Sequence, residues 1–577
     1  MTLARHLPII GWLPRYRREY LARDLAAGLT TAVMLVPQGM AYAMLAGLPP
    51  VMGLYASLVP LVAYALFGTS RQLAVGPVAM DSLLVAAGVG AIAAPGSGEY
   101  VGYAVLLAGM VGALQLVMGI ARLGFITNFL SQPVVSGFTS AAALIIGMSQ
   151  LGPLLGVDLP RSSYVHRTLE SALLRLGDAH LPTLAIGVSS ITLLYLLRRW
   201  RRKLPGALIV VGLGTLTAWW FGLDGDGVKI VGRVPAGLPQ PRLPEFGLDK
   251  AAQLVPTALA IALVAFVEAI SISKLYARRE GYEIDANQEL VGIGVANLGG
   301  SLFSGYPVTG GFSRTAVNAQ AGAQTALAGV VTAMVVALTL LLFTPLFHFL
   351  PKAVLAAIIM TAVFGLIDLR EVRRLWRVKR SDLALLLFTF VATLSLGIQQ
   401  GILAGVLVSL LWFVARSTRP HVAVLGRLPG TRSFRNMKRY PEAVPEPGVL
   451  VVRMDAQLYF GNVSFLRETL RRLEAEQSEP LRAVVIDASG MNELDSSAEA
   501  ALSEIANEYR AREVQLFFSR VKGPVRDVLR RSGLWDAIGS EHFFLDNLSA
   551  LEAAVGRSKP EPAPESSSHG RRRDPST

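Results

Sequence analysis

Long stretches without a charged residue alternate with short charged turns over most of the chain before residue 420. Asp, Glu, Lys and Arg are absent from residues 25–70, 100–121, 123–157, 179–197, 315–351 and 383–415. A helix needs about 20 mainly apolar residues to cross a membrane, so the longer stretches each hold more than one crossing or a broken helix. The pattern predicts about 14 crossings, with a first half that ends near residue 222 and a second half that begins near Ala251.

The composition fits a membrane protein and excludes several other classes. Apolar residues (AVILMFWYC) make up 52% of the 577 residues and charged residues only 16%, whereas soluble domains carry about a quarter charged residues. Cys is absent, which excludes disulfides, thiol catalysis and Cys-based zinc sites. The sequence has no P-loop, no nucleophile–base pair and no metal-ligand cluster, so we expect no enzymatic activity, no ATP-driven transport and no metal or other cofactor.

The placement of the basic residues indicates the orientation of the chain. The net charge of +13 comes from short clusters between apolar stretches, which argues against a nucleic-acid partner. The clusters are Arg15–Arg23, Arg71, Arg122, Arg198–Lys203, Arg278–Arg279, Arg370–Arg380 and Arg416–Arg419. Because basic turns face the cytoplasm, we expect a multi-pass protein of the cell (inner) membrane with both termini cytoplasmic. Residues 1–23 show no cleavable signal peptide and are interpreted as a cytoplasmic amphipathic segment.

A short motif occurs at matching places in the two halves. Gly76-Pro77-Val78 and Tyr306-Pro307-Val308 each precede a helix-like stretch, with the prolines 230 residues apart (307 − 77). Pro suits the first position of a helix, and a helix that begins inside the membrane leaves free N–H groups that attract an anion. Gly/Pro-interrupted segments at corresponding positions point to a transporter's binding site. Alternatively, each Pro only kinks an ordinary helix.

Few charges lie inside otherwise apolar stretches, and such residues are candidates for function. Arg314 follows the second Pro-Val and adds a positive charge to that helix start. Glu268 has the opposite sign and would repel an anion unless it were protonated or paired, so it is a candidate for coupling to H⁺ or Na⁺. The alternative is a structural Glu268–Arg314 ion pair. Asp81 is a further carboxylate inside an apolar stretch.

The same segments resemble a known family. The matching stretches are Asp24–Thr30, Val36–Ala43, Ala46–Pro50, Gly53–Ser57, Leu66–Pro77, Asn287–Leu290, Ala296–Leu298, Gly305–Asn318 and Leu350–Ile359. In this order they are similar to the sulfate permease (SulP) family, solute carrier family 26. The resemblance implies a mostly α-helical membrane domain of 14 segments. These form 7 + 7 inverted repeats, divided into a core and a gate domain, at residues 24–420 (about 24–222 and 251–420).

The resemblance also implies where a substrate binds. The third and tenth segments would be half-helices whose N-termini face each other, with the anion between the backbone at Val78–Ala79 and at Phe312–Ser313, beside Arg314. Gln38, Tyr42 and Glu268 would line the pocket. Gln38 has an alternative role, since its amide can satisfy carbonyls freed by Pro37, and Tyr42 can equally be core packing. A homodimer is implied by the resemblance alone.

Asp81 departs from the family pattern, in which an apolar or small residue is expected about one turn into the first half-helix. An ionised Asp81 that faced the anion would oppose binding. The residue then faces the gate, forms a second protonatable site or pairs with Arg314. The sequence leaves these three possibilities open, and Asp81 is kept as a candidate for coupling.

The composition changes after Arg419 and predicts a small cytoplasmic α/β domain at residues 440–555. Strands are expected at Val449–Met454, Ala483–Asp487 and Val514–Phe518, and helices at about 463–475, 496–511 and 524–532. The domain resembles the STAS domain, in which a Ser before a helix is phosphorylated. Ser496 and Ser497 are therefore regulatory candidates, with a helix N-cap as the alternative. Residues 556–577 are predicted to be disordered.

The expected function is secondary active transport by an elevator-like movement of the core against the gate. The substrate class is a small inorganic or carboxylate anion (sulfate, bicarbonate or a dicarboxylate), with H⁺ symport favoured. Alternatives are Na⁺-coupled symport, anion exchange or an anion channel of the same fold. A membrane-anchored signalling scaffold that works through the STAS domain is a further hypothesis from another class.

Overall fold

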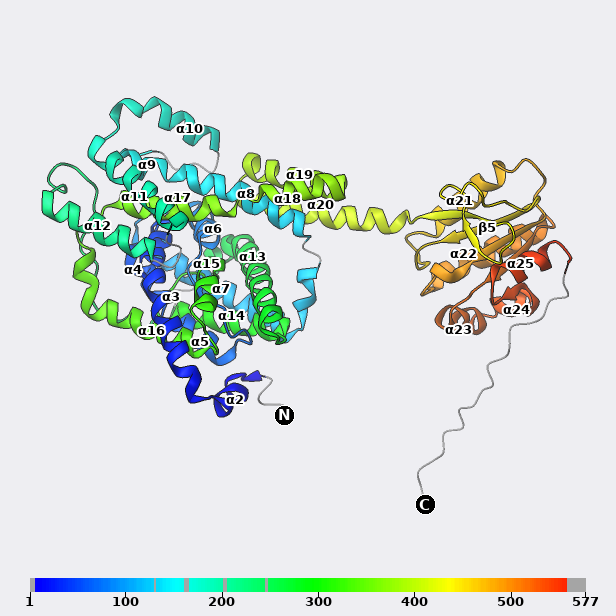
Figure 1. The fold of residues 1–577 in the computed structure, drawn as a ribbon, viewed down its shortest axis with the longest axis horizontal. Coiled ribbons are helices and arrows are strands. Elements are labelled where there is room, and N and C mark those ends of the chain that lie inside the picture. The colour runs from blue at the N-terminus through cyan, green and yellow to red at the C-terminus, as the bar shows by residue number, and fades with distance from the viewer. Residues whose placement is uncertain (1–5, 129–130, 160–164, 201–204, 244–246, 558–577) are drawn as a thin grey trace, which may run out of the picture. The chain divides into compact units, whose positions relative to one another are not determined.

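The structure, a computed structural model, describes residues 6–128, 131–159, 165–200, 205–243 and 247–557. The chain divides into two compact units, Met1–Ser409 and Leu410–Thr577 (Figure 1). Of the predicted disordered tail at 556–577, residues 558–577 lie outside the described residues. Each unit is described by itself below.

The first unit consists of helices that fall into two halves. The first half contains α2 (Ile9–Trp12), α3 (Arg18–Leu45), α4 (Pro50–Tyr55), α5 (Val59–Phe67), α6 (Ala79–Gly90), α7 (Gly98–Ile120), α8 (Gln132–Ser149), α9 (Leu151–Leu155), α10 (Val165–Leu174), α11 (Leu181–Trp200) and α12 (Gly206–Phe221). The second half contains α13 (Leu248–Glu280), α14 (Ala286–Leu302), α15 (Phe312–Gln320), α16 (Leu327–Leu338), α17 (Lys352–Val363), α18 (Leu369–Val378) and α19 (Arg380–Leu396). The helix α20 (Ile398–Thr418) begins in the first unit and ends in the second.

The predicted boundary between the two halves falls between α12 and α13. The halves meet between Phe221 and Leu248, where boundaries near 222 and 251 were expected. Among the described residues, nine helices are long and apolar enough to cross a membrane, and α4 and α5 count together as one of them. The helix α3 begins at Arg18, so part of the predicted N-terminal segment 1–23 belongs to the first membrane helix.

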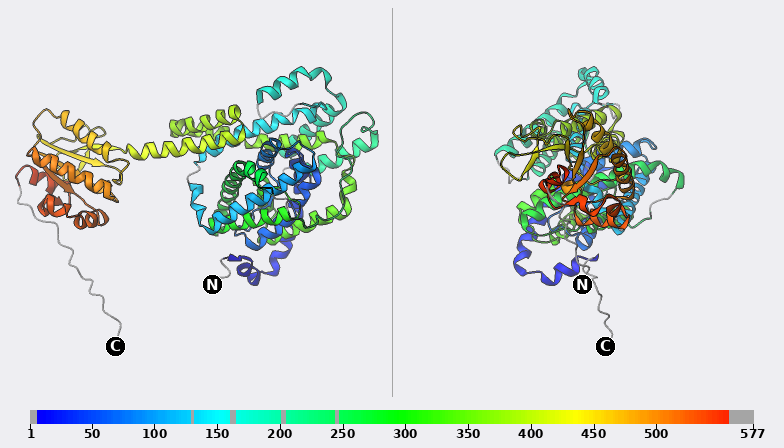
Figure 2. Two further views of the ribbon diagram at one scale, coloured as in Figure 1. Left: turned by 180° about the vertical axis from the view of Figure 1, so that it is seen from behind. Right: turned by 90° about the vertical axis from the view of Figure 1, so that its right-hand side faces the viewer.

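Helices from the two halves interleave, as the mixed blue and green ribbons show (Figure 2), and their contacts form two packing groups. In one group α3 packs on α16, α7 packs on α13 and α14, and α14 packs on α5. In the other, α8 packs on α17 and α19, and α11 packs on α12 and α17. This arrangement matches the predicted core and gate, and α6 lies in the first group through its packing on α13, α3 and α7.

Two buried carboxylates join the halves near the short helices. Asp24 on α3 accepts hydrogen bonds from the backbone N–H groups of Gln324 (2.7 Å) and Thr325 (3.1 Å), which lie between α15 and α16. Glu289 on α14 accepts from the backbone N–H groups of Thr69 (2.7 Å) and Ser70 (3.1 Å), which precede α6. Each carboxylate therefore satisfies backbone donors of the opposite half, which fixes the loops that flank α6 and α15.

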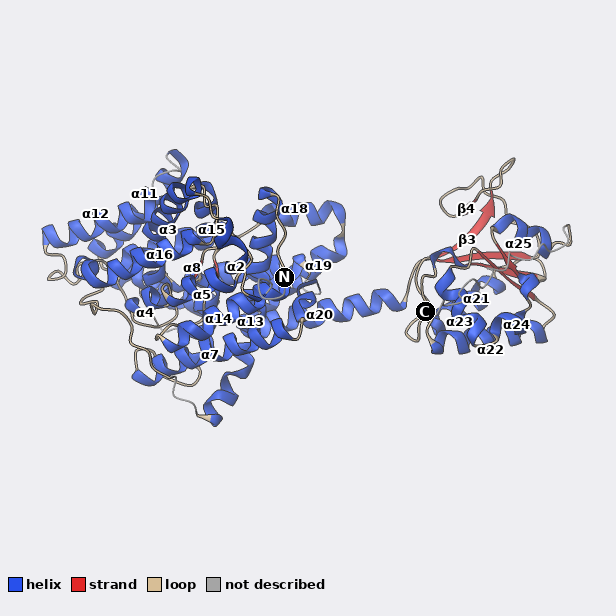
Figure 3. Cartoon of the chain, turned by 90° about the horizontal axis from the view of Figure 1, so that it is seen from below, coloured by secondary structure: helices blue, strands red, loops and turns tan. Residues whose placement is uncertain are grey.

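The second unit contains a six-stranded sheet in the order β4-β3-β5-β6-β7-β8 (Figure 3). Its strands are β3 (Val422–Arg427), β4 (Phe434–Asn436), β5 (Val449–Met454), β6 (Ala483–Asp487), β7 (Gln515–Ser519) and β8 (Phe543–Phe544), and β5 to β8 pair in parallel. Helices cover both faces. They are α21 (Val463–Ala475), α22 (Ser496–Ala511), α23 (Gly523–Arg531), α24 (Leu534–Ile538) and α25 (Asn547–Ala554).

Alternate residues of the central strands pack on opposite faces of this sheet. Leu450 and Val452 join the core under α21 and α22, whereas Val449 and Val451 join the core under α25. The strands predicted at 449–454 and 483–487 are confirmed, and the third predicted strand is shifted by one residue. The sheet also begins earlier than residue 440, because the edge strand β4 and its neighbour β3 precede that position.

One helix contact in the first unit depends on two glycines. A Cβ added to Gly53 on α4 would lie 1.9 Å from the carbonyl oxygen of Gly39 on α3. We expect Gly53→Ala to destabilise the protein by roughly 1–3 kcal/mol, because the two backbones would have to separate. The measurement is the apparent melting temperature of the purified protein in detergent.

The matched control is Gly212→Ala on α12, where an added Cβ has no heavy atom within 4 Å. It should leave the melting temperature unchanged or raise it slightly, since Ala favours a helix over Gly. Equal melting temperatures for the two variants would contradict the close contact.

Candidate functional site

Both short helices begin inside the apolar part of the chain. The helix α6 has 12 residues and α15 has 9, which correspond to about 18 Å and about 14 Å at 1.5 Å per residue. Neither length can cross a hydrocarbon core of about 30 Å. The interpretation of the two prolines as kinks in continuous helices is therefore wrong, and the predicted half-helices are confirmed.

A short antiparallel ladder joins the two segments just before these helices begin. Strand β1 (Val75–Gly76) pairs with β2 (Thr309–Gly310), with Val75 opposite Gly310 and Gly76 opposite Thr309. The backbone N–H of Gly311 also donates to the carbonyl of Ala74, at 3.1 Å. Residues more than 230 positions apart are thus direct neighbours, so the starts of α6 and α15 are held close to each other.

The first turns of both helices have open backbone donors. The N-cap residues are Val78 for α6 and Gly311 for α15, and neither provides a side-chain cap. The predicted contact points Val78 and Ala79 are buried, whereas the side chains of Phe312 and Ser313 are exposed. Uncapped N–H groups together with the positive end of the helix dipole form a site suited to an anion.

Arg314 connects the two helix starts. Its side chain is 1% exposed and extends from the first turn of α15 to the carbonyl of Pro77, to which Nη1 donates at 2.5 Å. Within the described part of the chain, Nε and Nη2 have no hydrogen-bond partner. A Cβ added to Gly311 would lie 2.8 Å from the guanidinium carbon, so glycine leaves the room that this side chain occupies.

Two carboxylates act on this cation from other positions. Glu268 on α13 and Asp81 on α6 are the acidic groups in the electrostatic environment of Arg314. The guanidinium donates to Pro77 and forms no hydrogen bond with Glu268 among the described residues, so the alternative of a direct Glu268–Arg314 pair is not the arrangement in this structure. Asp81 is 0% exposed, and neither of its carboxylate oxygens has a partner in the described ranges.

The two predicted side chains on α3 lie in the same environment. Gln38 is buried, and its Oε1 has no hydrogen-bond partner among the described residues. Tyr42 is also buried, and both Arg314 and Glu268 act on its hydroxyl electrostatically. The structure therefore brings Gln38 and Tyr42 from α3 together with the charged residues of α6, α13 and α15.

Asn297 on α14 supports the second helix start, a role that the sequence analysis did not assign. Its Oδ1 accepts from the backbone N–H of Val308 at 2.8 Å, and its Nδ2 donates to the carbonyl of Val308 and to Gln115 Oε1, both at 3.0 Å. Thr315 performs a similar task for the first segment, since its hydroxyl accepts from the N–H of Ala74 at 3.1 Å. Buried amides in apolar stretches were the available signal in the sequence.

The two candidate serines of the second unit do not cap a helix. Asp495 is the N-cap of α22 and accepts from the backbone N–H of Ala498 at 2.8 Å. Ser496 and Ser497 are the first two residues of α22, and both side chains are exposed. The N-cap interpretation of these serines is wrong, because the preceding aspartate takes that position.

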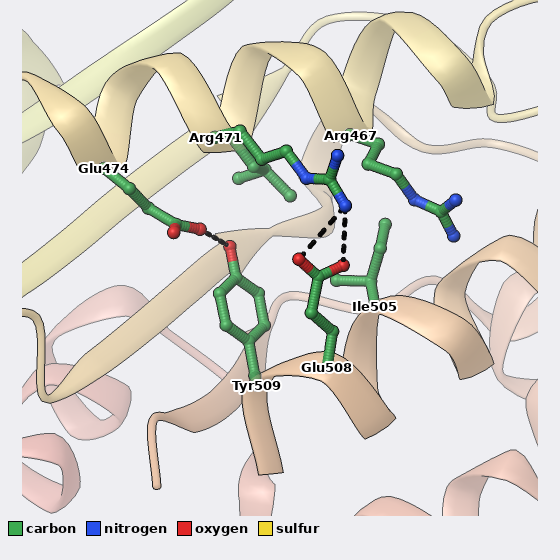
Figure 4. Close-up of a pocket in the computed structure, with 7 residues that line it drawn as sticks. Arg467, Arg471, Glu474, Ile505, Glu508 and Tyr509 are labelled. Atoms are coloured by element: carbon green, nitrogen blue, oxygen red, sulfur yellow. Dashed lines mark hydrogen bonds and ion pairs between the residues drawn. The ribbon is translucent and has the colours of Figure 1, made fainter. Parts of the chain in front are cut away.

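A crease between α21 and α22 contains a further cluster of charged residues (Figure 4). Arg471 pairs with Glu508 at 3.2 Å, and Tyr509 donates to Glu474. Burial and this carboxylate raise the pKa of Tyr509 above its usual range. The crease encloses about 10 Å³, room for about one water molecule. Its remaining cation, Arg467, pairs with Glu504 on α22, so the crease is a helix–helix contact rather than an anion site.

Comparison with known proteins assigns the chain to a family. The Sulfate permease family matches residues 21–389, which include both helix starts and α13, and the STAS domain matches residues 440–550. The chain belongs to the sulfate permease family. It is a sulfate/anion transporter of this family, and its second unit is the STAS domain.

Similar proteins cover nearly the whole chain. Sulfate transporter 4.1, chloroplastic, of Arabidopsis thaliana is 41% identical over 95% of this chain and 82% of the relative. A probable sulfate transporter of Mycobacterium tuberculosis is 36% identical over 96% of this chain and 99% of the relative. The solved structure of murine solute carrier 26 family member A9, an anion transporter in the inward-facing state, has a TM-score of 0.89 and 26% identity, covering 96% and 95% of the two chains.

The position of Arg314 generates a binding prediction. We expect Arg314→Gln to weaken sulfate binding by at least about tenfold, because truncating one partner of a buried charge interaction typically costs 2–5 kcal/mol. The measurement is the stabilisation of the purified protein by increasing sulfate concentrations in detergent. Arg278→Gln, at the exposed end of α13, is the control and should bind as the unchanged protein does. Equal sulfate affinity of both variants would contradict the assigned role.

Proposed function

We propose that the chain is an H⁺-coupled symporter of sulfate that holds the dianion between the N-termini of α6 and α15. The observation that carries the proposal is the pair of uncapped helix starts, joined by β1 and β2, with the guanidinium of Arg314 between them. The names of the relatives as sulfate transporters support sulfate within the wider class of anions. Bicarbonate and dicarboxylates are the competing substrates, because a helix start recognises charge more than shape.

The charges around the site favour a doubly charged substrate. Each helix start contributes about half a positive charge, and Arg314 contributes a full one. A dianion compensates this sum in a buried region, where an uncompensated charge is costly. The open donor Arg314 Nη2 can supply a hydrogen bond to the anion without giving up a protein partner.

Glu268 is the proposed coupling residue. An ionised carboxylate beside the site repels an incoming dianion, so the anion binds with the protonated form and the two travel together. Binding then couples to the proton concentration on each side of the membrane. The alternatives within the same fold are Na⁺ coupling, anion exchange and an anion channel. Replacing Na⁺ by N-methylglucamine tests for Na⁺ coupling, and recording single-channel currents tests for an anion channel.

The proposed movement is an elevator. The site belongs to the packing group of α3, α6, α7, α13, α14, α15 and α16, which would shift as one body against the group of α8, α11, α12, α17 and α19. Localisation in the cell membrane with cytoplasmic termini, and a homodimer, are part of this proposal. Regulation through Ser496 or Ser497 stays a prediction, supported by the exposure of both side chains.

Replacing Glu268 tests the coupling. We expect Glu268→Gln to weaken the acceleration of sulfate uptake by an inward proton gradient, because a neutral amide cannot exchange a proton. The measurement is uptake of labelled sulfate into proteoliposomes at several external pH values and a fixed internal pH.

The matched control is Glu280→Gln, an exposed carboxylate at the end of the same helix, which should keep the full response to the gradient. An undiminished response of Glu268→Gln would remove Glu268 from the coupling mechanism.

A further inference from the structure

Asp81 has the surroundings of a group that changes its charge during function. Its side chain is completely buried in the first turn of α6, three residues after the N-cap Val78. A carboxylate at this position commonly accepts from the backbone N–H of the N-cap residue. Here neither oxygen has a hydrogen-bond partner among the described residues. No hydrogen bond in the described ranges therefore fixes the charge of Asp81, and its ionised form depends on the positive charge of Arg314 and the positive end of α6.

The charged groups that face Asp81 belong to the anion site. Glu268 on α13 and Arg314 on α15 act on it electrostatically, and Asp81 in turn acts on the hydroxyl of Tyr306. Tyr42 on α3 is near the same groups. Helix α8, which also packs on α6, contains no titratable residue.

The remaining neighbour of α6 is α7, whose titratable residues have other partners. Glu99 lies 3.9 Å from Lys250, whose ammonium also lies 4.5 Å from the ring centre of Tyr103. Tyr100 donates to the carbonyl of Ala46 at 2.6 Å. The charge of Asp81 is therefore coupled to the anion site and not to α7 or α8.

An ionised Asp81 and a bound anion exclude each other. A negative charge in the first turn cancels the positive end of α6, which is one of the two helix starts that attract the anion. A bound anion in turn competes for Arg314, the only cation among the groups that act on Asp81. Asp81 must then be neutral while the anion is bound, as proposed for Glu268.

A sum of charges gives the number of protons. The two helix starts and Arg314 together provide about two positive charges. In the empty site, two ionised carboxylates, Asp81 and Glu268, balance this sum. In the occupied site, sulfate provides the two negative charges, and both carboxylates are then neutral. The site stays electrically balanced in both states only when two protons bind with each dianion.

We propose that Asp81 is a second proton-coupling site, so that the protein carries two protons with each sulfate in an electroneutral step. This inference rests on the proposed function and extends it from one proton to two. In each cycle one H⁺ binds to each of the two carboxylates together with one SO₄²⁻. The two protons and the sulfate are then released on the other side of the membrane. The resulting net charge moved is zero.

The stoichiometry is measured from the sulfate accumulation that the full-length protein reaches in proteoliposomes. The pH gradient is varied, and the membrane potential is set with K⁺ and valinomycin. Each coupled proton contributes about tenfold per pH unit to the accumulation ratio. We expect about 100-fold per pH unit and no response to the potential for the unchanged protein. For Asp81→Asn we expect about tenfold per pH unit and a response to the potential, because sulfate then moves with one negative charge.

Two variants complete the transport experiment. Glu268→Gln should also lose one proton, and Glu99→Gln, an exposed carboxylate on α7, should keep both. A slope of about tenfold per pH unit for the unchanged protein, or equal slopes for it and Asp81→Asn, would overturn the proposal and leave the proposed function intact. An unchanged protein that takes up no sulfate would refute the proposed function itself.

A second measurement covers an Asp81→Asn variant that folds but does not transport. Addition of sulfate to the purified protein in weakly buffered detergent solution should take up two protons per bound sulfate, and one in Asp81→Asn, as read by a pH indicator. Equal proton uptake by the two proteins would overturn the proposal. If Asp81→Asn does not fold, Asp81→Glu provides the test: it keeps a titratable group and should keep the uptake of two protons, and an uptake of one would overturn the proposal.

Discussion

Backbone hydrogen bonding in an apolar environment is the constraint on which this structure depends. A helix that begins inside a membrane leaves N–H groups that neither water nor lipid can satisfy. In the described part of the chain, the short helices α6 and α15 begin in this way, at Ala79 and at Phe312, and the β1–β2 ladder and the hydrogen bond from Arg314 to Pro77 hold the two beginnings together. The open donors then point to a ligand as their missing partner, and a negative charge suits them best.

The surrounding helices serve to keep this arrangement fixed. Asn297 satisfies both backbone groups of Val308, and Thr315 accepts from Ala74. Asp24 accepts from a backbone N–H group after α15, and Glu289 accepts from one before α6, so each carboxylate fixes a loop of the opposite half. The irregular backbone is thus satisfied by side chains that come mainly from the other repeat. This explains why the two halves interleave instead of forming separate bundles.

The sequence predicted the fold at the level of elements. The charge-free stretches located the membrane helices, and Gly76-Pro77-Val78 and Tyr306-Pro307-Val308 marked the approach to the two half-helices. Neither proline is the first helical residue, because α6 begins at Ala79 and α15 at Phe312. The pairing of Val75 with Gly310 was not predictable, since strands of two residues leave no periodic pattern. The capping role of Asp495 and the pairing of β3 with β4 and β5 were missed for a related reason. Each depends on a neighbour that the sequence alone does not identify.

The charged residues Arg314, Glu268 and Asp81 were predicted from their positions in apolar stretches, and the other site residues from the family resemblance, while the electrostatics of the site came from the structure. Arg314 donates to a carbonyl rather than to Glu268, and Asp81 has no hydrogen-bond partner among the described residues. Both facts depend on side-chain positions. They distinguish a site whose charged groups change partner when the ligand binds from a permanent Glu268–Arg314 ion pair. In the proposed scheme, the ionised carboxylates balance the positive charge of Arg314 and of the helix N-termini while the site is empty. The anion balances the same charge when it is bound.

A structure of the full-length protein with bound selenate, a heavier analogue of sulfate that can be located by its anomalous scattering, tests the central claim most directly. The account predicts one selenate between the first turns of α6 and α15, with its oxygens within hydrogen-bond distance of backbone N–H groups near Ala79 and Phe312 and of the Arg314 guanidinium. Selenate bound elsewhere in the membrane domain, with this position empty, would contradict it.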